Sequence, residues 1–239
     1  MNEFNVGSVL SRSVGIWLKN LVPFVIIALV AHAPVLVYTY IAGESLTGIK
    51  TWSILVSFIA LLCGNIATGA IVYGVLMQLR GEPASIGRCI AVGLGRMFPI
   101  LGVAIASGLA VGLGVLLLII PGLIVLTMLY VAVPVAVVER PGVFASLNRS
   151  GDLTKGNRWN VFAVVVVQGI ITLGLSYVLN KTVFADPTSL GELRTYMMVS
   201  QTVTTVLASL SAVFAAVCYH DLKLTKEGAT IEELVSVFS

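Results

Sequence analysis

Polar side chains that could act inside a membrane are few in this chain, and they stand within long apolar stretches: His32, Asn65, Gln168 and Gln201. Polar groups at membrane depth are costly and often functional, so His32 could relay protons. Because His32 has no acidic neighbour in its own stretch, a structural hydrogen bond is the favoured interpretation. The three amides favour hydrogen bonds between helices, and a substrate path is the alternative if they converge.

Basic residues are the second set that could bind a ligand, and they lie outside the apolar stretches. Basic residues on the cytoplasmic side of a membrane can bind anionic lipid headgroups. The alternative is that they only set the topology and extend their side chains toward water. The headgroup candidates are Arg12, Arg88, Arg149, Lys155 and Arg158. Glu139 ends an apolar run nearby, and we expect one of these arginines to neutralise it in an ion pair.

Three short basic segments, which we call elbows, precede long apolar runs. Their arginines are Arg12, Arg88 and Arg149, and the residues eleven positions later open the runs: Pro23, Pro99 and Asn160. Apolar residues recur at helical spacing in the first two elbows, which predicts helices in the headgroup plane with apolar faces toward lipid. The third elbow contains Gly151 and Gly156, which predicts an interrupted and less regular helix.

Catalytic chemistry has no support in the sequence. No G-x-S-x-G, Walker or H-E-x-x-H motif is present, and no span residues pair as nucleophile and base. The three cysteines are too few and too scattered for a metal site or a disulfide framework. The net charge of +3 is spread over helix ends and gives no nucleic-acid signal. We therefore expect no enzyme activity, no cofactor, no metal and no nucleic-acid partner.

Composition identifies the class of protein. Of 239 residues, 58% are hydrophobic and only 10% are charged, whereas charged residues make up about a quarter of a soluble domain. About 20 apolar residues in a helix cross a bilayer, and strand-like alternation is absent. The sequence thus predicts an all-α integral membrane protein with six transmembrane helices, over Leu21–Ala42, Trp52–Met77, Pro99–Ile120, Gly122–Val138, Asn160–Asn180 and Thr195–Cys218.

One membrane domain over residues 1–239 is expected, organised as three parallel repeats of an amphipathic elbow plus a helical hairpin. Parallel repeats imply an axis along the membrane normal, and a roughly threefold arrangement fits this pattern. The boundaries are repeat 1 over 4–77, repeat 2 over 82–138, repeat 3 over 143–218 and a cytoplasmic tail over 219–239. In the tail, Thr230 and Glu233 form a capping box that predicts a short helix.

Small residues follow one face of the third span. Ala104, Gly108 and Gly112 recur every fourth residue, a spacing that lets helix backbones approach closely. Packing within the chain is the favoured interpretation, and a dimer contact is the alternative, so the sequence is compatible with an oligomer.

The distribution of basic residues predicts the orientation. Eleven of the 14 lysines and arginines fall on the side that holds both termini and the elbows, and three fall on the other side. Lysine and arginine accumulate in cytoplasmic loops. The expected location is therefore the bacterial cytoplasmic (inner) membrane, with multiple passes and both termini in the cytoplasm.

A family resemblance is carried by residues 115–165. It comprises IIPGLI from Ile119, VPVAVVE from Val133, and Ser146-x-x-x-Ser150-x-x-Leu153-Thr154-x-Gly156-x-x-Trp159. These motifs resemble a bacterial group around the membrane domain of glycerophosphoryl diester phosphodiesterases and the YciC-like inner-membrane proteins. The resemblance implies a multi-span domain linked to lipid metabolism. Fused members add a catalytic barrel with metal-binding acidic residues and histidines, which this sequence does not contain, so no activity is carried over.

The leading functional hypothesis is a non-enzymatic, lipid-associated scaffold or partner protein. Its elbows would engage anionic headgroups, and its partner could be another membrane protein or a protein of lipid metabolism. The alternative is a small transporter or channel with a path through the helix bundle, lined by the four polar span residues.

Overall fold

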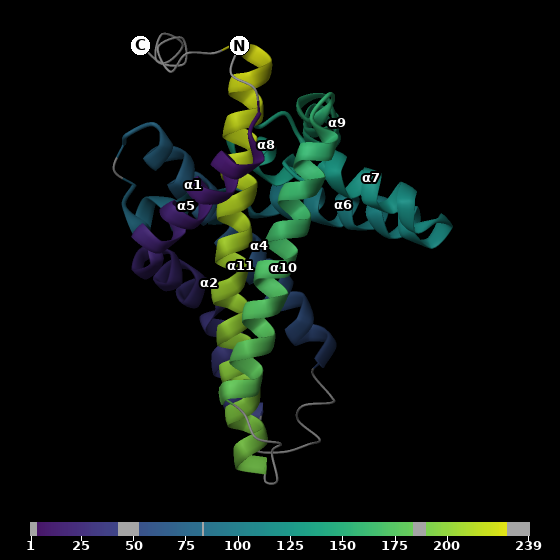
Figure 1. Ribbon diagram of the computed structural model, residues 1–239. Helices are drawn as coiled ribbons and strands as arrows, with labels where there is room; N and C mark the ends of the chain where they lie inside the picture. The colour runs from purple at the N-terminus through teal and green to yellow at the C-terminus, as the bar shows by residue number, and fades with distance from the viewer. Residues whose placement is uncertain (1–3, 43–52, 83, 184–189, 229–239) are drawn as a thin grey trace.

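The structure is a computed structural model that describes residues 4–42, 53–82, 84–183 and 190–228. Over these residues the chain is helical, with no strand (Figure 1). The helices are α1 (Val6–Lys19), α2 (Leu21–Ala42), α4 (Ser53–Leu79), α5 (Ile86–Gly95), α6 (Met97–Leu117), α7 (Ile119–Leu129), α8 (Ala132–Val138), α9 (Val143–Thr154), α10 (Arg158–Val183) and α11 (Leu190–Glu227).

Six stretches are long and apolar enough to cross a bilayer, which confirms the predicted all-α membrane protein with six transmembrane helices. Five are single helices, and the fourth is made of α7 followed by α8. The stretches are Leu21–Ile41, Val56–Leu79, Met97–Leu117, Ile119–Val138, Arg158–Val178 and Thr195–Glu227.

Each predicted elbow is a short helix that leads into a long one. Asn20 alone separates α1 from α2, and Arg96 alone separates α5 from α6. Side chains cap the first two elbows: Asn5 accepts a hydrogen bond from the Ser8 backbone N–H, and Ser85 accepts one from the Arg88 N–H. The short-then-long order follows the predicted pattern, whereas an internal repeat with three parallel hairpins stays a prediction.

The third elbow is more regular than predicted. Helix α9 continues through Gly151 without a break, so the interruption expected there is wrong. Gly151 is accommodated because the Met128 side chain fills the space beside it, 3.6 Å from where a Cβ would stand. The helix ends at Thr154, and Gly156 takes the φ of +90° that the turn into α10 requires.

The apolar face of the first elbow packs against protein, so the prediction that this face points toward lipid is wrong. In α1, Val9 and Ser13 are buried, and Val14 and Trp17 pack against the main core. The reason is that α1 lies against α10 and α11, which offer an apolar surface of their own. Helix α1 therefore packs as part of the helix bundle.

The hairpin of α6 and α7 does not run beside the other long helices. In Figure 1 it points sideways, away from the long direction of α10 and α11. Its base is held by α4, α8 and α9, and Ile100 and Val103 are buried there. Beyond the base its apolar side chains are exposed, up to 83% at Leu116 beside the turn. The roughly threefold arrangement of hairpins is therefore not seen.

The glycine stripe of α6 does not serve packing within the chain. A Cβ at Gly108 or Gly112 would meet no atom within 4 Å, so the favoured interpretation is wrong for these two positions, and a dimer contact stays a prediction. The predicted tail helix with Thr230 and Glu233 lies outside the described residues.

A glycine of α5 allows a close approach between two helices. A Cβ at Gly93 would collide with the Ile66 carbonyl oxygen of α4 and stand 3.1 Å from the Ala70 backbone nitrogen.

Replacing Gly93 with alanine should destabilise the protein by about 1–3 kcal/mol, because the obstacle is the backbone of α4 and cannot rotate away. Thermal unfolding in mild detergent measures the effect. Gly87→Ala in the same helix is the matched control, since a Cβ at Gly87 meets nothing within 4 Å; it should be neutral or stabilising. Equal melting temperatures for the two variants would contradict the close approach.

Candidate functional site

Charged residues gather around Glu139, where α8 ends. The Glu139 carboxylate accepts hydrogen bonds from the Arg149 Nε at 2.9 Å, the Tyr219 hydroxyl at 2.8 Å and the Lys223 Nζ at 3.2 Å. Arg149 also pairs with Glu227. This cluster, the Glu139 junction, joins α8, α9 and α11. It agrees with the expected neutralisation of Glu139 by an elbow arginine.

The ionisation of the Glu139 junction follows from these contacts. Burial opposes the charge on Glu139, but hydrogen bonds from Arg149 and Tyr219 and the charge of Lys223 outweigh it and hold the pKa of Glu139 below its ordinary value. Burial likewise opposes the charge on Arg149, but its two carboxylate partners raise the pKa of Arg149 above its ordinary value. Both groups are charged at neutral pH.

The serine-rich motif of the third elbow is a packing surface. Ser146, Ser150, Leu153 and Thr154 are buried on one face of α9. The Ser150 hydroxyl donates to the Met128 carbonyl oxygen at 2.7 Å, next to the break between α7 and α8. This contact satisfies a backbone group at a place where the helix is interrupted.

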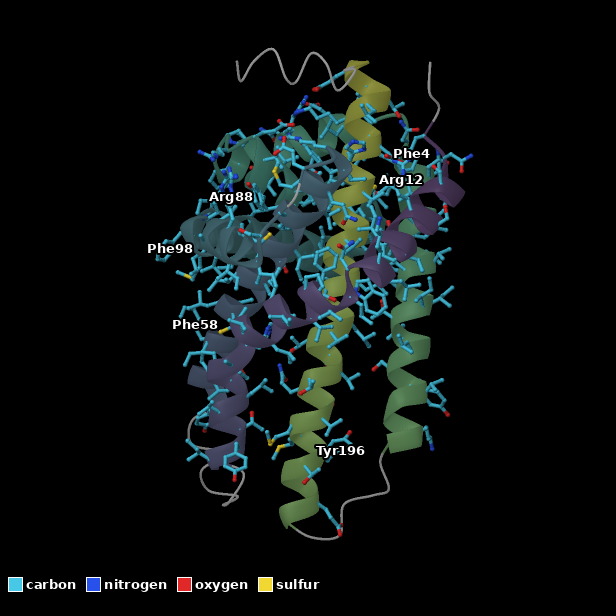
Figure 2. All side chains as sticks on the ribbon, turned by 90° about the vertical axis from the view of Figure 1, so that its left-hand side faces the viewer. Phe4, Arg12, Phe58, Arg88, Phe98 and Tyr196 are labelled. Carbon is cyan, nitrogen blue, oxygen red and sulfur yellow. The ribbon has the colours of Figure 1, made fainter. Side chains whose placement is uncertain are left out.

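The predicted headgroup arginines divide into paired and unpaired residues. Arg12 and Arg149 are held by carboxylates, since the Arg12 Nη1 stands 2.7 Å from Asp221. Arg88 and Lys155 are exposed, and no ion pair joins them to the described residues. The Arg158 Nε is buried without a hydrogen-bond partner. Figure 2 shows Arg12 and Arg88 toward one end of the molecule and Tyr196 toward the other.

A pair of arginines outside the predicted set lines a pocket. Arg96, between α5 and α6, and Arg140, after α8, share a cavity of about 460 Å³ whose remaining walls are small or apolar: Val92, Gly95, Pro99, Ala136 and Gly142. Neither guanidinium has a carboxylate partner among the described residues, and the Arg96 Nη1 is buried without a hydrogen bond. Burial lowers the pKa of Arg96, and the charge of Arg140 acts in the same direction.

The four polar span residues do not converge. His32 and Asn65 line one cavity of about 320 Å³ between α2, α4 and α11. Gln168 instead accepts a hydrogen bond from the Tyr130 hydroxyl, which joins α10 to α7. Gln201 lies on α11 and does not line that cavity.

Sequence reasoning missed Arg96, Arg140 and Thr205. Thr205 lines the cavity of His32, and its hydroxyl has no hydrogen-bond partner. Arg96 and Arg140 are 44 positions apart, so no local spacing relates them. A partial signal exists for Arg140, because it follows the last residue of the VPVAVVE motif and precedes Pro141-Gly142, where a turn is expected.

Comparisons with known proteins agree with a membrane family. The profile of the family described as Domain of unknown function (DUF7847) matches residues 5–222, so the chain belongs to this family. The UPF0259 membrane protein PC1_1998 of Pectobacterium carotovorum subsp. carotovorum (strain PC1) is 25% identical over 135 residues, which are 56% of this chain and 54% of that protein. The chain thus spans about half the length of this curated relative. No solved structure matches significantly.

These findings support the coarser part of the family prediction. The relative is a membrane protein from a bacterium, as the resemblance implied. Neither comparison involves a glycerophosphoryl diester phosphodiesterase, so that relation stays a prediction.

Replacing Glu139 with glutamine should lower the free energy of unfolding by about 2 kcal/mol, because it leaves Lys223 and part of Arg149 without their carboxylate. This figure is below that of a fully buried pair, since the Glu139 side chain is 19% exposed. Asp152→Asn, at an exposed position of α9, is the control and should change stability little. Chemical or thermal unfolding in detergent measures both.

The stabilisation that the Glu139 carboxylate provides should depend on pH. The pKa of Glu139 is lower in the folded than in the unfolded protein, so the stabilisation is complete above the unfolded-state pKa of about 4.3 and is lost as the pH falls through the lowered value. The difference in stability between wild type and Glu139→Gln should therefore shrink in acid. A difference that stays constant with pH would contradict an ionic role.

Proposed function

We propose that this member of the DUF7847 family is a non-catalytic protein of the bacterial cytoplasmic membrane that binds an anionic lipid headgroup through Arg96 and Arg140. The observation that carries the proposal is the buried Nη1 of Arg96, without a hydrogen bond, in a pocket that it shares with Arg140.

The electrostatics of this pocket favour an anion. Two guanidiniums that share a pocket repel each other unless an opposite charge lies between them. Gly142, the N-cap residue just before α9, also lines the pocket, and no side chain caps this helix. The N–H groups of its first turn and the positive end of its dipole add to the attraction for an anion. A phosphate oxygen pair suits the forked donors of arginine.

The surroundings favour an anion that carries hydrocarbon chains. The pocket opens where α5 meets α6, at the beginning of a membrane-spanning stretch. Val92, Pro99 and Ala136 supply an apolar wall, and Phe98, which precedes Pro99 in the chain, is 74% exposed. Figure 2 shows Phe98 at the edge of the molecule, where it can meet lipid. A phospholipid matches both the charge and the apolar wall.

The remaining basic candidates act around this pocket in our proposal. Arg88 and Lys155 are exposed and would attract anionic lipids without holding one, since exposed charges contribute little each. Arg158 is a further candidate through its unpartnered Nε. Arg12 and Arg149 serve the protein's own carboxylates and would not be headgroup ligands.

The proposal also includes the orientation of the protein in the membrane and its role beside other proteins. The cytoplasmic orientation of both termini is supported by the eleven basic residues on that side. A scaffold role beside a protein of lipid metabolism is supported by the family resemblance.

A small transporter is the second candidate function. The cavity that His32 and Asn65 share supports it. The separate positions of Gln168 and Gln201 weaken it, because a path lined by all four residues is not formed.

Replacing Arg96 with glutamine should reduce retained phosphatidylglycerol about tenfold, because a charge-assisted hydrogen bond contributes about 1.5–3 kcal/mol. Quantitative mass spectrometry of lipids bound after purification in mild detergent measures the effect. Arg140→Gln should act in the same direction.

Arg88→Gln is the matched control, since Arg88 lies on the adjacent helix but does not line the pocket. Its effect should stay within about twofold. Equal lipid retention by wild type and Arg96→Gln would contradict the proposal. Displacement of the lipid by inorganic phosphate would show that the pocket recognises the phosphate group, whereas resistance would indicate that the hydrocarbon chains contribute to binding.

A further inference from the structure

A second cavity lies among the membrane-spanning helices and is independent of the arginine pocket. It has a volume of about 320 Å³ and is lined by α2, α4 and α11, with Ala104 of α6 at one wall. Among the described residues, no lysine, arginine, aspartate or glutamate lines it. The walls are mostly alanine, glycine, leucine and isoleucine, and five polar side chains reach it: His32, Asn65, Thr68, Thr205 and Ser209.

The hydrogen bond of His32 indicates which tautomer the neutral ring adopts. The His32 Nδ1 stands 3.0 Å from the Ala28 carbonyl oxygen. A carbonyl can only accept, so Nδ1 carries the proton, and Nε2 of the neutral ring is an acceptor. A Cβ at Gly64 would stand 3.8 Å from this Nε2. Glycine at position 64 thus keeps the space beside the acceptor open.

Thr205 supplies the complementary group. It is 3% exposed, and its hydroxyl has no hydrogen-bond partner. The other two hydroxyls of the cavity are satisfied, because Thr68 donates to the Gly64 carbonyl and Ser209 donates to the Val206 carbonyl. Ser209 also accepts from the Trp17 Nε1 at 2.9 Å. Buried polar groups are almost always paired, so the Thr205 hydroxyl can donate a hydrogen bond to a ligand in this cavity.

We propose that this cavity binds the hydroxyl group of an uncharged lipid alcohol. A hydroxyl both donates and accepts, so it can donate to the His32 Nε2 and accept from the Thr205 Oγ1. A carbonyl head could only accept and would leave Nε2 without a donor. A charged head would enter a site with no opposite charge, which is costly in a membrane.

The size and the walls of the cavity fit the same ligand. Its volume corresponds to about ten water molecules at about 30 Å³ each, which exceeds what the polar side chains alone would organise. The alanine, leucine and isoleucine side chains can cover the first part of a hydrocarbon chain. The remainder of the chain would extend into the surrounding bilayer. The ligand class therefore includes diacylglycerols and long-chain isoprenoid alcohols.

The test uses the full-length protein in detergent and a diacylglycerol with a photoactivatable diazirine in one acyl chain. Labelled peptides are identified by mass spectrometry. We expect saturable labelling of α2, α4 and α11 that unlabelled diacylglycerol suppresses. The same molecule with its hydroxyl converted to a methyl ether should compete at least tenfold less well, because the ether cannot donate to His32.

Two pairs of variants test whether Thr205 and the space beside His32 bind the lipid hydroxyl. Thr205→Val should reduce labelling about tenfold, whereas Thr204→Val, next to it on the exposed side of α11, should leave labelling unchanged. Gly64→Val should abolish labelling by filling the space beside His32. Its control is Gly169→Val, since a Cβ at Gly169 meets nothing within 4 Å.

The melting temperature distinguishes a ligand-binding role of Thr205 from a purely structural one. In lipid-free protein, Thr205→Val should keep or raise the melting temperature, because it removes an unpaired polar group; the rise that diacylglycerol causes in wild type should be lost. A fall in the melting temperature of lipid-free Thr205→Val would overturn the assignment. So would labelling that does not saturate, which would mean non-specific contact of the probe with the apolar surface, or equal competition by the methyl ether. None of these outcomes depends on Arg96 or Arg140, so the two proposals can fail separately.

Discussion

The structure depends on a carboxylate that would be costly to bury without partners. Glu139 stands where α8 ends, and donors from two other helices surround it: Arg149 of α9, and Tyr219 and Lys223 of α11. A half-buried carboxylate needs such partners to stay ionised. Their arrangement forces α8, α9 and α11 to meet at one point. The junction thereby attaches the C-terminal part of α11 to α8 and α9.

Both candidate sites are positioned from this junction. Arg140 is the next residue, and its φ of +56° is unusual for a side chain that carries a Cβ. That turn places Arg140 beside Arg96 and sets the direction in which α9 leaves. On the other side, α11 continues from Lys223 to Ser209 and Thr205, where it forms one wall of the membrane cavity. One electrostatic contact thus constrains both the arginine pocket and the cavity between α2, α4 and α11.

The sequence was sufficient for features that depend on local composition. Run length and hydropathy located the six spans, and the position of Glu139 at the end of an apolar run predicted its ion pair with an arginine. Features that depend on distant contacts were out of reach. Amphipathic spacing in α1 showed one apolar face, but only tertiary packing decides whether lipid or α11 covers it. The sideways direction of the α6–α7 hairpin also could not be predicted from the sequence. Its apolar side chains are compatible with a hairpin beside the other helices and with one that points away from them.

The arginines show why residue type alone could not identify a site. Arg149 belongs to the most basic stretch of the sequence, yet two carboxylates occupy its donors. Arg96 stands alone between two helices, yet its buried Nη1 has no acceptor. An arginine can bind a ligand when it is buried beside another positive group and no carboxylate of the protein pairs with it. Such availability is determined by three-dimensional neighbours, since Arg140 is 44 positions away along the chain. The same reasoning applies to Thr205, whose chemistry equals that of Thr68 and differs only in the missing partner.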